Sequence, residues 1–158
     1  MHIAVTAAVM AFIFVQSALP GDLSGAESNI IVQLLHGLTG IEAETLSLFV
    51  RKAAHFTEYL ILGVCLALNA RDHMLAHREA DAVGCNLDQK TDSMTDSTQW
   101  KYWLTAWLVG TAYAVTDEIH QLFVPDRACA FFDVCIDSAG VAVGLAVAII
   151  ILKHRRSY

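Results

Sequence analysis

Four long hydrophobic blocks, each carrying very few charges, constrain the fold of this chain more than any other feature. They span residues 3–19, 53–70, 102–122 and 130–152. An α-helix of about 20 apolar residues crosses the hydrocarbon of a bilayer, and backbone groups in lipid must be hydrogen-bonded within their own segment. The pattern therefore predicts an all-α polytopic membrane protein: a single domain over residues 1–158 built as a four-transmembrane-helix bundle.

Composition supports this class. The 158 residues are 56% apolar and 16% charged, against about 45–50% and about 25% in soluble domains. The net charge of −6 offers no basic surface for nucleic acid, so no nucleic-acid partner is predicted. Block 3–19 could alternatively be a signal peptide, but a basic segment before it is missing and three more blocks follow, which favours an uncleaved spanning helix.

The distribution of lysine and arginine predicts the orientation. Seven of the ten basic residues lie in the 71–101 segment or after the fourth block, and three lie in the segments on the other side. We therefore expect a multi-pass protein of the bacterial cytoplasmic (inner) membrane with both termini cytoplasmic. Residues 71–101 form a polar cytoplasmic connector in this topology.

Residues 28–50 contain apolar positions at helical spacing, among them Ile30, Ile31, Leu34 and Leu38. One apolar face on an otherwise polar segment is typical of a helix lying in the membrane interface. The sequence predicts such an amphipathic helix at the outer interface. A lid over the outer mouth of the bundle is the alternative.

Ionisable residues inside the blocks gather at one membrane face once this topology is applied. The groups at the outer ends of the second, third and fourth blocks are His55, Glu58, Asp117, Glu118, His120, Asp133 and Asp137. An ionisable side chain deep in a bilayer costs about 2.5–3.5 kcal/mol or more, so such groups mark a functional site by default. We expect them to surround a hydrated pocket near the outer rim, where Arg51, Lys52 and Arg127 can pair with them.

Helical spacing assigns these residues to faces. Lys52, His55 and Tyr59 share one face of the second block, and Asp117 and Gln121 share one face of the third. In the fourth block Asp133 and Asp137 lie in line with Gly140 and Gly144, a GxxxG pattern that permits close approach of another helix.

Purely structural interpretations remain open beside the functional one. His55 and Glu58 could form a polar pair that fixes helix register, and Arg127 could be an interfacial anchor. Asp133 in the first turn of a helix is favoured by the helix dipole whatever its role.

The ordered motifs of the chain resemble the VanZ-like family of bacterial integral membrane proteins. They are Arg51-Lys52-Ala53-Ala54-His55-Phe56-Thr57-Glu58-Tyr59, Asp117-Glu118-Ile119-His120-Gln121, Arg127, and Asp133 to Gly140. Gln16-Ser17 also resembles the polar exit from the family's first helix. The resemblance implies a cell-envelope role and an effect on susceptibility to the glycopeptide antibiotic teicoplanin. It does not imply a mechanism.

Two functions follow. In the first, the protein acts on an envelope lipid or a lipid-linked wall precursor. His55, Glu58, Asp117, Glu118 and Gln121 are then the candidate catalytic residues, with His55 as general acid or base. Residues that bind the substrate are Arg51, Lys52, Tyr59, Arg127, Asp133 and Asp137. In the second, the site is a non-catalytic binder of a lipid or antibiotic head group; a transporter component is a third possibility.

No cofactor or metal is predicted, because neither HExxH nor a duplicated ExxH motif is present, although the histidines and carboxylates offer suitable ligand atoms.

Overall fold

Five α-helices account for nearly all of the chain that the computed structural model describes, which is residues 2–19, 21–84, 96–125 and 131–155. The helices are α1 (His2–Ser17), α2 (Gly21–Thr39), α3 (Ala43–Gly84), α4 (Asp96–Gln121) and α5 (Phe131–His154). No strand occurs within the described ranges. The all-α prediction is confirmed.

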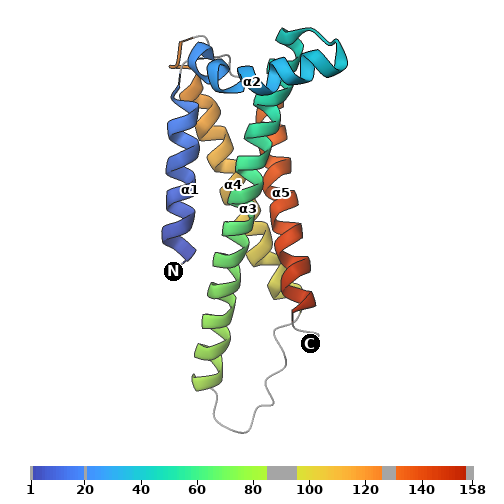
Figure 1. Cartoon of the computed structure of the whole chain (residues 1–158). Helices are drawn as coiled ribbons and strands as arrows, with labels where there is room; N and C mark the ends of the chain where they lie inside the picture. The colour runs from blue at the N-terminus through green and yellow to red at the C-terminus, as the bar shows by residue number, and fades with distance from the viewer. Residues whose placement is uncertain (1, 20, 85–95, 126–130, 156–158) are drawn as a thin grey trace.

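The helices α1, α3, α4 and α5 run side by side, and α2 crosses one end of them (Figure 1). The end crossed by α2 is called the upper end. It holds the last turns of α1 and α4 and the first turns of α3 and α5, whereas the lower end holds the opposite termini. The upper end is therefore where the predicted site residues of three helices lie.

Glycines let α3 and α5 approach until their backbones touch. A Cβ added at Gly140 would lie 2.7 Å from the carbonyl oxygen of Phe56, and one at Gly144 would lie 3.0 Å from the backbone nitrogen of Val64. The close approach predicted from the GxxxG spacing is confirmed, with α3 as the partner helix. The core around this contact contains Tyr59, Leu62 and Val141.

Two helices, α3 and α5, are long and apolar enough to cross a membrane. Helix α1 is apolar but has only 16 residues, which is about 24 Å of helix and short of the hydrocarbon thickness of about 30 Å. Length and composition thus support two of the four predicted spans. Spans through α1 and α4 stay a prediction.

Helix α3 is 42 residues long, about twice the length that a bilayer requires. It includes residues 71–84, and α4 begins at Asp96, so both helices extend into the segment that the sequence assigned to a polar connector. The physical reason is composition: residues 71–84 contain three Ala, two Arg and one each of Leu, Met and Glu, which are strong helix formers even when their side chains face water.

The single amphipathic helix expected over residues 28–50 is instead two helices. Gly40 has a φ of +69°, and its N–H donates to the carbonyl of His36 at 2.9 Å. A glycine in the left-handed region is the usual end of a helix, so α2 stops there and α3 starts afresh at Ala43. The predicted apolar face of α2 is exposed: Ile30, Leu34 and Leu38 are 80%, 65% and 75% accessible.

Candidate functional site

Polar side chains from the upper parts of α1, α3, α4 and α5 lie close together. Three of the acids are enclosed by protein, because Asp117 and Glu118 are each 2% exposed and Asp137 is 1% exposed. Around them lie half-buried groups at the rim: Arg51, Lys52, His55, Glu58 and Asp133. The expected hydrated pocket is thus a buried acidic centre with a partly exposed border.

His55, Asp117 and Asp137 form the centre of this cluster. One ligand atom from each of these residues lies within 4.8 Å of the other two, although the residues come from three different helices. We call these three residues the upper triad. Glu58, Glu118 and His120, which the sequence also offered as neighbours of His55, are not members of it.

A hydrogen-bond network from α1 and α4 holds Asp117 in place. The Ser17 hydroxyl donates to Oδ2 of Asp117 at 2.8 Å, and Nε2 of Gln121 approaches the same oxygen at 3.5 Å and the Ser17 hydroxyl at 3.4 Å. Ser17 is fully buried and was not among the predicted site residues. The signal that could have found it is its place beside Gln16 at the polar end of an otherwise apolar block.

Several buried polar atoms in the cluster have no hydrogen-bond partner in the described part of the chain. They are both carboxylate oxygens of Asp137, Oδ1 of Asp117 and the hydroxyl of Tyr59. Buried polar atoms without partners are uncommon in folded proteins. Tyr59 was predicted to bind substrate, but it is fully enclosed in the core, where its ring lies 6.2 Å from that of Tyr113.

The basic residues of the predicted binding set have different surroundings. Lys52 forms an ion pair with Asp133 and lies 5.5 Å from the centre of the Phe132 ring. These two predicted binding residues therefore neutralise each other across α3 and α5. Arg51 is half-buried at the same rim, and Arg127 falls outside the described residues.

His120 is not part of the upper triad. Its ring stacks on Phe14 of α1 with centroids 4.3 Å apart, and its Nε2 is buried with no hydrogen-bond partner in the described part of the chain. It thus provides a nearby histidine whose environment differs from that of His55.

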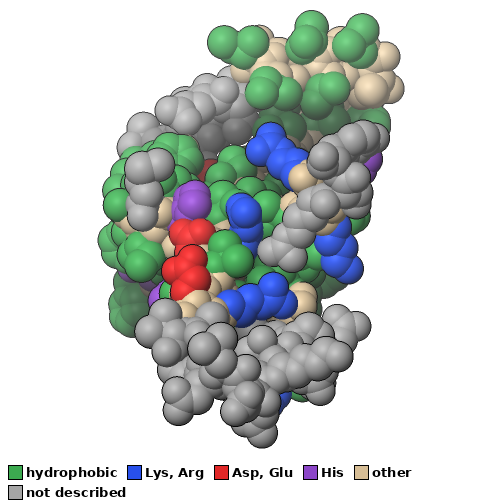
Figure 2. All heavy atoms as spheres, turned by 90° about the horizontal axis from the view of Figure 1, so that it is seen from below, with side chains coloured by type: hydrophobic (Ala, Val, Ile, Leu, Met, Phe, Trp, Pro, Cys, Tyr) green, Lys and Arg blue, Asp and Glu red, His purple; other side chains and the backbone are tan. Residues whose placement is uncertain are grey.

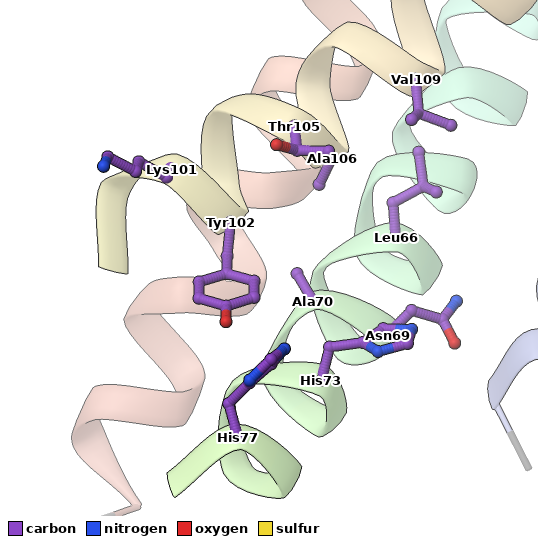
Figure 3. A pocket seen from close by; sticks show the side chains of 10 residues that line it. All are labelled: Leu66, Asn69, Ala70, His73, His77, Lys101, Tyr102, Thr105, Ala106 and Val109. Atoms are coloured by element: carbon purple, nitrogen blue, oxygen red, sulfur yellow. The ribbon is translucent and has the colours of Figure 1, made fainter. Parts of the chain in front are cut away.

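The lower end has a different character. A cavity of about 500 Å³ lies between α3 and α4, with Leu66, Ala70 and Ala106 on its walls and Lys101, Tyr102, His73 and His77 also lining it (Figure 3). Figure 2, which looks onto this end, shows basic side chains in several places and acidic ones gathered at one side. This cavity shares no residue with the upper triad.

Chemically, the upper triad places an imidazole beside two carboxylates in a site from which water is largely excluded. Carboxylates can orient a histidine ring and stabilise its charged form, and low surrounding polarity strengthens these interactions. The arrangement is therefore suited to proton transfer or to the binding of a cation.

Two helices long and apolar enough to cross a membrane, together with many exposed apolar side chains, are typical of a helical membrane protein. The chain belongs to the VanZ/LLP1 family, whose model matches residues 2–152. The match includes α1 to α4, α5 as far as Leu152, and every residue of the upper triad. No curated protein and no solved structure matches the chain.

Proposed function

We propose that the protein is a multi-pass protein of the bacterial cytoplasmic membrane whose upper end faces outward. The seven-to-three distribution of lysine and arginine supports this orientation, with both termini, Lys101 and Lys153 on the cytoplasmic side. All four bundle helices then span the membrane. The exposed apolar face of α2 at the upper end suits a helix lying in the outer interface.

The function that this site supports best is acid–base chemistry on the polar head of an envelope lipid or lipid-linked wall precursor. The observation that carries it is the upper triad, in which His55 lies beside Asp117 and Asp137. His55 is the half-buried member and the other two are enclosed. A substrate entering from the rim would therefore meet the imidazole, while the carboxylates behind it orient the ring.

In this mechanism His55 accepts a proton from the attacking group and returns it to the leaving group. Asp117, held by Ser17 and Gln121, keeps its position as charge develops on the imidazole. Arg51 at the rim binds the anionic part of the head group. Lys52 can join it only by exchanging Asp133 for the substrate.

A deletion strain complemented with variants tests this function. Wild-type protein and His73→Gln, a histidine variant at the other end of α3, should restore the envelope lipid profile and teicoplanin susceptibility of the parent. His55→Gln should leave the lipid profile of the deletion strain, since general acid–base groups contribute about 10²–10⁴-fold in rate. Full restoration by His55→Gln would contradict a catalytic role.

A non-catalytic binder of a lipid or antibiotic head group is the second candidate, favoured by the basic side chains at the rim. It predicts the reverse pattern in the same strains. His55→Gln would then restore teicoplanin susceptibility to the parental level, and Arg51→Gln would not.

A further inference from the structure

We propose that the upper triad is a binding site for a divalent transition-metal cation. The geometric basis is that a ring nitrogen of His55 and one carboxylate oxygen each from Asp117 and Asp137 lie within 4.8 Å of one another. Ligand atoms of a tetrahedral site with metal bonds of about 2.0–2.2 Å are about 3.4 Å apart. Adjustments of about 1 Å in side-chain position would therefore close the triad around an ion.

The unpartnered oxygens are an independent reason to expect a cation. Asp137 is 1% exposed, and neither of its carboxylate oxygens has a hydrogen-bond partner in the described part of the chain. A bound proton would remove the charge of this carboxylate and make one oxygen a donor, but it would leave the carbonyl oxygen without a hydrogen-bond donor. A metal ion supplies both the charge and the contacts.

Asp117 has the arrangement expected of a metal ligand. Its Oδ2 accepts hydrogen bonds from Ser17 and Gln121, and its Oδ1 has no hydrogen-bond partner among the described residues. Hydrogen bonds to the outer oxygen of a ligating carboxylate fix its orientation, and such supporting residues are a regular feature of metal sites.

The ligand set narrows the kind of ion. One imidazole and two carboxylates suit Zn²⁺ or Mn²⁺ better than Ca²⁺, which takes six or more oxygen ligands. Three protein ligands also leave a coordination position open for water or a phosphate oxygen. The binding of the ion rests on the geometry alone, whereas its use in chemistry rests on the proposed function. His55, Asp117 and Asp137 would hold the ion, which would supply a Lewis acid at the site. The role of His55 as proton acceptor would then belong to the ion-free protein.

Metal binding by the purified full-length chain in detergent tests the proposal. After treatment with a chelator, the protein is titrated with Mn²⁺ and the free ion is followed by electron paramagnetic resonance, with Zn²⁺ as competitor. Wild type should bind about one Mn²⁺ that Zn²⁺ displaces, and Asp137→Asn should bind it at least about 10-fold more weakly. The neighbouring variant His120→Gln should bind like wild type.

Thermal unfolding in the same samples provides a second readout. Mn²⁺ should raise the unfolding temperature of wild type and His120→Gln and leave that of Asp137→Asn unchanged. If Asp137→Asn does not fold, His55→Gln replaces it in both measurements. Wild-type binding no tighter than that of the triad variant would overturn the metal site.

These measurements use no lipid substrate, so the two proposals fail separately. A wild-type protein that binds Mn²⁺ but whose His55→Gln variant restores the lipid profile would keep the metal site and reject the catalytic function. If the wild-type protein binds no Mn²⁺ but needs His55 to restore the lipid profile, the metal site is rejected and the catalytic function is kept.

Discussion

The two ends of the bundle differ in how deeply their acidic side chains are buried. At the upper end, Asp117 and Asp137 are enclosed and several of their oxygens have no partner in the described chain. At the lower end, Asp72 is exposed and pairs with His2 at 2.6 Å, and the polar side chains that line the cavity between α3 and α4 include exposed ones such as His77. Buried charge costs free energy whereas exposed charge costs little, so the upper end is where we expect chemistry.

The strongest test of the packing that holds the upper end together is Gly144→Ala. A Cβ there would lie 3.0 Å from the backbone of Leu60 and Val64, and backbone cannot move aside as a side chain can. We expect a loss of about 2–3 kcal/mol in the free energy of unfolding, measured by thermal or denaturant unfolding in detergent. Gly37→Ala is the matched control, since nothing lies within 4 Å of its added Cβ; destabilisation of both variants to the same degree would contradict the close contact.

Removal of one hydroxyl group at each end compares charged and neutral partners. Ser17→Ala deletes the donor to the buried carboxylate of Asp117 and the acceptor for Gln121. Thr6→Val deletes the acceptor for Asn69 at 2.6 Å and the donor to the carbonyl of His2 at 3.0 Å. Bonds to charged groups contribute about 1.5–3 kcal/mol and neutral ones about 0.5–1.5 kcal/mol. Ser17→Ala should therefore lower the unfolding free energy more than Thr6→Val, and the reverse order would count against a charged Asp117.

Neutralising an acid at each end should change stability in a way that depends on burial. In metal-free buffer Asp137→Asn should raise the unfolding free energy by about 1 kcal/mol or more, because it removes an enclosed carboxylate that lies beside the carboxylate of Asp117. Asp72→Asn should change it by less than about 0.5 kcal/mol, since its ion pair with His2 is exposed. Equal changes in unfolding free energy for the two substitutions would contradict the proposed effect of burial at the upper end.

Filling the lower cavity should have the smallest effect. Ala106 is buried on the cavity wall, and Ala106→Leu adds apolar atoms where space exists. We expect a change of less than about 1 kcal/mol in unfolding free energy and no change in Mn²⁺ binding at the upper triad. A loss of Mn²⁺ binding in this variant would show that the ends are coupled.

Helical periodicity predicted which residues share a face, and much of the site followed from that. It placed Asp117 in line with Gln121 and Gly140 in line with Gly144, and the structure shows the first pair near the same serine and the second against α3. The convergence of three helices at one end followed from the alternating direction of the hydrophobic blocks. These features depend only on local geometry and chain order.

The particular partners across helices were not predictable from one sequence. The sequence predicted that Lys52 can pair with the acids of the site, and the structure shows that Asp133 is the partner. Spacing along a helix does not give the distance to the next helix, so the enclosure of Asp137 and the contribution of Ser17 were missed. The break at Gly40 required the backbone angle that this glycine adopts.

The most direct test of the account is a double-mutant cycle between His55 and Asp137. The unfolding free energies of wild type, His55→Gln, Asp137→Asn and the double variant are measured in detergent without metal. Residues in contact couple by about 0.5–3 kcal/mol, so we predict that the two effects are not additive. Additivity within about 0.3 kcal/mol would mean that α3 and α5 do not bring these side chains together, and the site would not exist as described.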